Sequence, residues 1–274
     1  VVALVIPRYE GIFYSYYALE LIRGIGTLCE ALKLDLLLHL TDSKSTINLK
    51  GIGGIIFADI ISNRAQLEDA LASGTPCIVI NNYVEDLEVS CIAVDNIGGA
   101  EEAVNYLIGL GHKRIAHITG DLVTQAAARR FEGYKRTLKK NNIEFREAYV
   151  FKTDYSRGQA RGAAEKLIKM PERPTAVFVA SDSMALEVMA VAKELGLKLP
   201  GDLSIVGFDD NPSGLYGSVS LTTVRQPLIK MAEESVKELN LLISRKEKGA
   251  KGIKRVLLPT ELVIRESCQP VDSK

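Results

Sequence analysis

Residues 177–210 read VFVASDSMALEVMAVAKELGLKLPGDLSIVGFDD and give the clearest indication of the fold class. It holds two short apolar runs separated by about 20 residues with helical spacing, which predicts one strand–helix–strand unit. Each apolar run stops at small or acidic residues. In an open parallel sheet, the residues that follow the strands lie in the crevice at the carboxyl ends, where ligands bind. We therefore expect Ser181, Asp182 and Asp209 at a small-molecule site.

Strand-like and helix-like segments alternate along the whole chain. Two successive series of this kind predict an α/β fold with two doubly wound parallel-sheet subdomains, each with helices on both faces of its sheet. The expected strands and extended segments are 1–7, 34–40, 54–57, 76–80, 92–94, 114–118, 148–151, 176–179, 204–207, 221–224 and 256–265. The expected helices are 15–32, 63–72, 97–110, 124–141, 157–169, 182–195 and 227–243.

The last helix and the last extended segments are too few to form a third strand–helix series, so they must complete the two earlier sheets. The chain then crosses between subdomains at Asp95-Asn96, at Gln226-Pro227 and near 257–259, which predicts a three-crossover hinge. The expected subdomains are residues 1–95 plus 228–256 and residues 96–227 plus 257–274. Such a hinge suits two lobes that close a cleft around a ligand.

The charge balance argues against direct nucleic-acid binding by these residues. The chain holds 34 basic and 34 acidic residues, whereas nucleic-acid-binding domains usually carry a basic patch. The one basic cluster, at residues 245–255, lies in a Gly-containing connection, and we interpret it as a solvated loop.

Membrane spans, disulfides and metal sites are not indicated either. No apolar run reaches 18 residues. The opening segment VVALVIP lacks a basic flank and reads as a strand rather than a signal sequence. It begins inside an element, so we expect that an upstream piece has been removed. Four cysteines without C-x-x-C spacing indicate a reducing cytoplasm, and three histidines without ligand spacing predict no metal.

Enzyme motifs are missing from the sequence. The glycines of 51–54 precede a strand, so they cannot offer amides to a phosphate at a helix N-terminus, and we expect no cofactor. Ser181 has no local base for nucleophilic catalysis. Asp209 and Asp210 are adjacent on an extended end and point in opposite directions. We expect one to face the cleft and the other to cap the next turn, and we expect no enzyme activity.

Two further features suit a polyhydroxylated ligand. Residues 9–17 hold five aromatic side chains, among them Phe13, Tyr16 and Tyr17, at the carboxyl end of the first strand. They form either a stacking wall for an apolar sugar face or a hydrophobic staple for the next helix. Arg130 opens an amphipathic helix and could fork onto ring hydroxyls while held by Asp209. Each hydroxyl both donates and accepts, so such a polar set suits a polyol.

An ordered set of motifs from residue 95 onward resembles the LacI/GalR family of bacterial transcription regulators, in its effector-binding part. The motifs are LGHKRIAHITG at 110–120, RFEGY at 130–134, VASDSMA at 179–185, LSIVGFDD at 203–210, LTTVRQP at 221–227 and LPTELVIRES at 258–267. The resemblance implies the periplasmic-binding-protein type I fold, a homodimer, and a small effector that alters operator binding. It also implies an upstream helix-turn-helix headpiece, the only part expected to touch operator DNA.

The resemblance also implies further ligand contacts. Arg130 and Asp209 match the family's usual contacts, and the remaining matches are Asn81, Tyr155, Ser181 and Gln226. Two departures stand out: Ser181 replaces a frequent Asn, and GIFYSYY at 11–17 replaces a usual Asn-Pro-Phe-Phe.

We predict a cytoplasmic regulator domain that binds a sugar or sugar derivative, with a purine or amino acid as the other ligand classes. The alternative function is a secreted solute-binding protein of a sugar transporter.

Overall fold

The computed structural model describes residues 1–8, 12–42, 46–247 and 252–271. The chain divides into two compact units. The first unit comprises Val1–Val94 with Pro227–Leu258, and the second comprises Asp95–Gln226 with Pro259–Lys274. The basic residues expected in the loop at 245–255 lie partly outside the described residues, as does Tyr9.

The first unit is built on a sheet with strand order β11-β5-β4-β3-β1-β2, and all its pairings are parallel. Its strands are β1 (Val2–Pro7), β2 (Leu36–Thr41), β3 (Gly54–Ala58), β4 (Cys77–Ile80), β5 (Ser90–Val94) and β11 (Arg255–Leu258). Its helices are the short η1 (Ile12–Tyr14), α1 (Tyr16–Ala31), α2 (Arg64–Ala72) and α7 (Leu228–Glu247).

Strand alternation distributes the core of the first unit over both faces of its sheet. In β1, Leu4 packs on the face that carries α1 and α7, and Val5 packs on the face that carries α2. Both side chains are fully buried. A strand that is apolar on both faces is expected where helices cover both sides of a parallel sheet.

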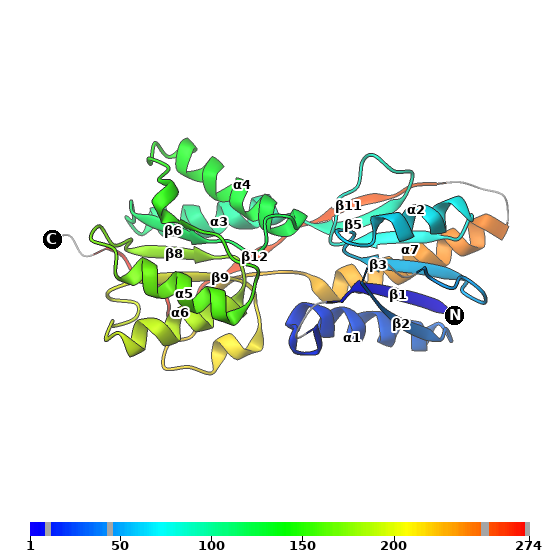
Figure 1. The fold of residues 1–274 in the computed structure, drawn as a ribbon, viewed down its shortest axis with the longest axis horizontal. Coiled ribbons are helices and arrows are strands. Elements are labelled where there is room, and N and C mark those ends of the chain that lie inside the picture. The colour runs from blue at the N-terminus through cyan, green and yellow to red at the C-terminus, as the bar shows by residue number, and fades with distance from the viewer. Residues whose placement is uncertain (9–11, 43–45, 248–251, 272–274) are drawn as a thin grey trace. The chain divides into compact units, whose positions relative to one another are not determined.

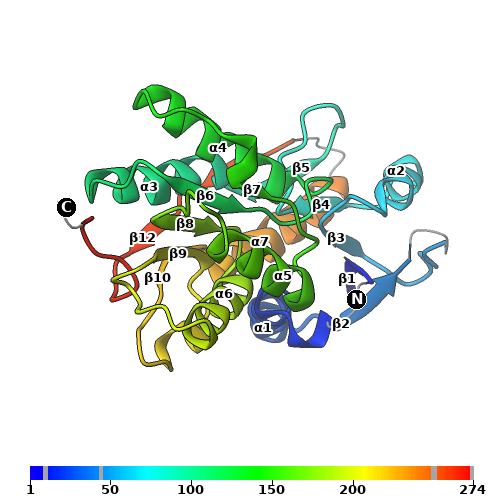
Figure 2. The same ribbon diagram turned by 60° about the vertical axis from the view of Figure 1, so that its left-hand side comes forward.

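The second unit repeats this plan with strand order β12-β10-β9-β8-β6-β7. Its strands are β6 (Ile115–Ile118), β7 (Val150–Phe151), β8 (Ala176–Val179), β9 (Ser204–Asp209), β10 (Thr222–Arg225) and β12 (Glu261–Val263). Its helices are α3 (Asn96–Gly109), α4 (Gln125–Lys140), η2 (Glu147–Tyr149), α5 (Arg157–Ile168), α6 (Asp182–Glu194) and η3 (Pro212–Leu215). Helices α3 and α4 cover one face of this sheet and α5 and α6 the other, as Figures 1 and 2 show.

The predicted α/β fold class is confirmed, with two departures in detail. The extended segment expected at 256–265 is two strands, because β11 joins the first sheet and β12 joins the second. Strand β12 runs antiparallel to β10. No helix lies between β11 and β12 to carry the chain back to the amino edge of the sheet. Strand β12 therefore enters the second sheet from its carboxyl edge and runs antiparallel.

The packing of α3 against α4 depends on a glycine. A Cβ atom on Gly133 would lie 2.6 Å from the carbonyl oxygen of Ile97 and 2.8 Å from Cβ of Ala100. Gly162, inside α5, has nothing within 4 Å of the same position.

Gly133→Ala should therefore lower the free energy of unfolding by about 1–3 kcal/mol, the usual effect of overpacking a close contact. Gly162→Ala should raise it by about 0.5–1 kcal/mol, because alanine loses less backbone entropy in a helix. Urea unfolding followed by circular dichroism checks both changes. Shifts of the same sign in both variants would contradict the packing argument.

Candidate functional site

The carboxyl ends of β8, β9 and β10 bring the predicted polar residues of the second unit to one edge of its sheet. Ser181 follows β8, Asp209 ends β9, and Gln226 follows β10. Because these three strands are parallel neighbours, their carboxyl ends lie side by side.

Asp209 is half-buried and its backbone is strained. Its φ of 133° and the φ of 60° at Asp210 lie in the left-handed region that side chains other than glycine rarely adopt. The Asp209 carboxylate accepts a hydrogen bond from Nε2 of Gln226 at 2.6 Å. Strained backbone of this kind concentrates at functional sites.

Arg130 is buried and held in a way that the sequence did not predict. Its Nε donates to Oδ1 of Asn96 at 2.8 Å, and its Nη1 donates to the carbonyl oxygen of Ala180 at 2.5 Å. Its guanidinium carbon lies 3.7 Å from the centroid of the Phe208 ring. Among the described residues, no hydrogen bond or ion pair joins Arg130 to Asp209, so the expected direct contact is not found, although the charge of Arg130 does act on Asp209.

Asp182 lies inside the unit, not in the crevice where we expected it. Its side chain is fully buried. It accepts hydrogen bonds from Oγ1 of Thr223 at 2.6 Å and from the backbone N–H of Asn211 at 2.7 Å. The carboxylate of Asp182 packs so closely against Gly207 that a Cβ atom on Gly207 would lie 2.1 Å from Oδ1 of Asp182.

The pKa values of Asp182 and Asp209 are both raised, and burial is the largest cause in each case. Burial, followed by the nearby charge of Asp209, raises the pKa of Asp182. Burial also raises the pKa of Asp209, while the charge of Arg130 and hydrogen bonds from Gln226 and the backbone of Asp182 lower it.

Asp210 does not cap the next turn, as we had expected for one of the two aspartates. It forms ion pairs with Arg225 at 2.7 Å and with Arg265 at 2.5 Å. The cap of η3 is Asn211, whose Oδ1 accepts from the backbone N–H of Ser213.

Ser181 and Tyr155 occupy the same edge of the second unit, with structural contacts of their own. Oγ of Ser181 accepts from the backbone N–H of Met184 and caps α6. Tyr155 has a φ of 69°, and its ring covers Gly120 so closely that a Cβ atom there would lie 2.0 Å from Cζ of Tyr155. Both residues stay candidates for ligand contact.

The first unit carries a comparable set at the carboxyl ends of β3 and β4. Asn81 is buried, has a φ of 67°, and its Oδ1 has no hydrogen-bond partner among the described residues. Asp59 has a φ of 75°, and its Oδ1 is likewise buried without a partner in the described chain. Burial raises the pKa of Asp59.

Asp59 is not among the residues predicted from the sequence, although its position carries the same signal as that of Asp209. Asp59 directly follows the apolar run GIIFA at 54–58, just as Asp209 ends its own apolar run. Asn82, which follows Asn81, accepts from the backbone N–H of Ile60 at 3.0 Å and so fixes the loop after Asp59.

The aromatic segment of the first unit divides into two groups. Tyr16 and Tyr17 open α1 and pack against the core between β1, α1 and α7. Phe13, in η1, is 58% exposed, and Tyr14 is 91% exposed. Core packing at the helix start matches the staple interpretation for Tyr16 and Tyr17, and the exposed ring of Phe13 suits the stacking interpretation.

No metal-binding group of three or more His, Cys, Asp or Glu side chains occurs within the part of the chain that the structure describes. Within that part, no helix is both long enough and apolar enough to span a bilayer.

Comparison with known proteins places the chain in a family. A family described as a periplasmic binding protein-like domain matches residues 104–268. Catabolite control protein A of Priestia megaterium is 31% identical over 97% of this chain and 81% of its own length. A LacI family transcriptional regulator from Mycobacterium smegmatis has a TM-score of 0.84 and 26% identity, covering 98% of this chain and 99% of that one. The chain belongs to the LacI family of transcriptional regulators.

A solved complex of the transcriptional regulator CelR with cellobiose is also similar to this LacI-family chain. It has a TM-score of 0.86 and 26% identity, and the match covers 97% of this chain and 84% of that one. The chain covers the effector-binding domain of the family.

Asp182→Asn should make the stability of this LacI-family domain less sensitive to pH. A raised pKa in the folded state means that protonated Asp182 stabilises the fold below about pH 4, and that this stabilisation is lost as the pH rises toward about 7. The asparagine cannot ionise. The difference in unfolding free energy between wild type and variant should therefore shift in favour of the variant as the pH rises.

Urea unfolding at a series of pH values measures that difference. Groups far from Asp182 titrate alike in both proteins and cancel, whereas the neighbouring Asp209 contributes to the difference. Asp69→Asn, at an exposed position on α2, serves as the control and should parallel the wild type. Parallel curves for wild type and Asp182→Asn would show that Asp182 does not titrate in this range.

Proposed function

We propose that this domain binds a small polyhydroxylated effector, a sugar or sugar derivative, and that binding controls operator recognition by the helix-turn-helix headpiece of the regulator. The observation that carries the proposal is the Asp209 and Gln226 pair beside Arg130 at the carboxyl edge of the second unit. We further infer that the regulator acts in the cytoplasm and is not an enzyme.

The chemistry of the unpartnered atoms supports a polyol. Oε1 of Gln226 is buried without a partner among the described residues, and so are Oδ1 of Asn81 and Oδ1 of Asp59. Gln226 belongs to the second unit, Asn81 and Asp59 belong to the first, and each of these acceptors by itself suits an O–H donor. The Nη2 of Arg130 makes no hydrogen bond to any described residue, so it can donate to a hydroxyl oxygen.

Buried acceptors without partners are unfavourable, because each loses its hydrogen bonds to water. A ligand hydroxyl that donates to such an atom removes this penalty and contributes to affinity. A purine offers few donors, and an amino acid would bring its own carboxylate near that of Asp209, so both ligand classes suit these atoms less well.

The relatives support the same choice by analogy. The CelR structure is a complex with cellobiose, and the sequence relatives are named for transcriptional or catabolite control rather than transport. This weighs against a solute-binding protein of a sugar transporter.

Calorimetry of the domain against a panel of mono- and disaccharides, nucleosides and amino acids tests the effector class. We expect binding within the sugar group, and Asp209→Asn should weaken it by roughly tenfold to a hundredfold, since a charge-assisted hydrogen bond contributes about 1.5–3 kcal/mol. The asparagine still accepts from Gln226, so the fold should persist.

Asp69→Asn is the matched control, because it removes the same charge at an exposed position and should leave affinity unchanged. Binding of nucleosides or amino acids alone would refute the sugar proposal. If Asp209→Asn binds sugar with unaltered affinity, the Asp209 carboxylate does not contribute to sugar binding.

We also propose that the domain forms a homodimer, as the resemblance to its family implies. Exposed leucines support burial against a partner copy: Leu37 on the edge strand β2 is 45% exposed, and Leu19 on α1 is 46% exposed. Sedimentation equilibrium at micromolar concentration should give the mass of two chains. A single-chain mass at that concentration would contradict the proposal.

A further inference from the structure

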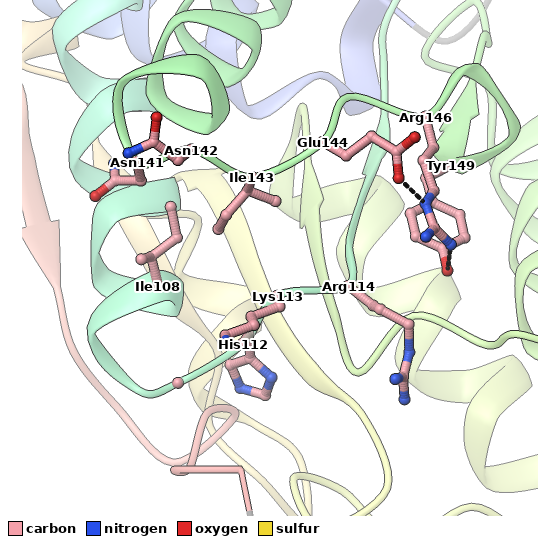
Figure 3. Close-up of a pocket in the computed structure, with 11 residues that line it drawn as sticks. Ile108, His112, Lys113, Arg114, Asn141, Asn142, Ile143, Glu144, Arg146 and Tyr149 are labelled. Atoms are coloured by element: carbon pink, nitrogen blue, oxygen red, sulfur yellow. Dashed lines mark hydrogen bonds and ion pairs between the residues drawn. The ribbon is translucent and has the colours of Figure 1, made fainter.

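A separate cavity lies in the second unit, at the opposite edge of the sheet from Asp209. It has a volume of about 430 Å³ and is formed by the ends of α3 and α4, the segment before β6 and the loop before η2 (Figure 3). Some of these segments lie directly before β6 and β7. The others are the last residues of α3 and α4, which lie at the amino ends of the strands. The effector proposed above therefore does not account for this cavity.

The walls of the cavity carry more positive than negative charge. Three cationic side chains line it, those of Lys113, Arg114 and Arg146, against one carboxylate, that of Glu144. His112 is buried in the wall, with its two ring nitrogens 2.9 Å from Oγ1 of Thr175 and 3.1 Å from the carbonyl oxygen of Gln269. Burial also lowers its pKa.

The positive charge is not neutralised evenly. Arg146 is paired with Glu144 at 2.9 Å and with Glu172 at 2.6 Å. Arg114 donates only its Nε, to the carbonyl oxygen of Arg173 at 3.1 Å. Among the described residues, its terminal nitrogens and the ammonium group of Lys113 have no partner, and both side chains are exposed.

Helix C-termini ordinarily disfavour anions, and two helices end at this cavity. In this unit several carbonyl groups near the two helix ends accept from backbone donors. The N–H of Gly111 binds the carbonyl oxygen of Ile108, that of Val271 binds Leu110, and that of Ile143 binds Leu138. Lys113 and the terminal nitrogens of Arg114 can therefore donate to an anion at this opening.

We propose that this cavity is a second binding site, for a small phosphorylated molecule whose phosphate oxygens are bound by Lys113 and Arg114. Guanidinium nitrogens match the spacing of phosphate oxygens, and an ammonium group adds a compact charge. The volume is in the range of small-molecule sites, roughly 300–1,000 Å³, and exceeds what a single inorganic ion needs. Ile108 and Ile143 supply an apolar wall for the rest of the ligand.

Calorimetric titration of the domain with pyrophosphate at about 0.15 M salt, where contacts between exposed charges are screened, tests the site. We expect saturable binding that the double variant Lys113→Gln/Arg114→Gln weakens by at least about tenfold, because it removes two charge-assisted donors. The control Lys50→Gln/Lys230→Gln removes the same charge at exposed positions of the first unit and should bind within about twofold of wild type.

Amide chemical shifts in NMR spectra locate the bound probe. Perturbations confined to the segments 108–114 and 141–149 support the proposal. Absence of binding by the wild-type domain, equal weakening in both double variants, or perturbations centred on Ser181 and Asp209 would each overturn it. Matching melting temperatures of the two double variants confirm that loss of binding is not loss of fold.

Discussion

The buried carboxylate of Asp182 is the interaction on which the carboxyl edge of the second unit depends. Placed at the first residue of α6, it accepts from Thr223 of β10 and from the backbone after β9, so one side chain joins a helix to two strands. Burying a carboxylate is unfavourable unless hydrogen bonds compensate, and these two contacts offset only part of that penalty, since the pKa of Asp182 stays raised. The closeness of Gly207 shows that no larger residue fits at that point of β9.

The strained conformation of Asp209 follows from this arrangement. Its φ of 133° persists because the surrounding chain holds it: Gln226 donates to its carboxylate, and the next residue, Asp210, is held by two arginines. Arg130 is fixed separately by Asn96, Ala180 and the Phe208 ring. The groups proposed to bind the effector are therefore positioned before any ligand arrives, which reduces the entropy lost on binding.

The two edges of the second sheet carry opposite chemistry. The carboxyl edge offers unpartnered acceptors, such as Oε1 of Gln226, and suits a ligand rich in hydroxyl donors. The amino edge offers the unpaired donors of Lys113 and Arg114 and suits an anion. The second unit therefore offers a different ligand chemistry at each edge of its sheet.

Local sequence pattern is enough to predict the α/β fold and the edge of the sheet at which the polar residues gather. Both follow from local pattern: apolar runs end on Ser181, Asp209 or Asn81, and parallel strands must end at a common edge. Only the tertiary structure decided which of these side chains faces solvent and which is buried. Asp182 and Asp209 both follow an apolar run in the sequence. In the structure Asp182 is buried against Gly207, whereas Asp209 is half-exposed. That distinction depends on contacts between residues far apart in the chain, such as Thr223 with Asp182, which no local pattern contains.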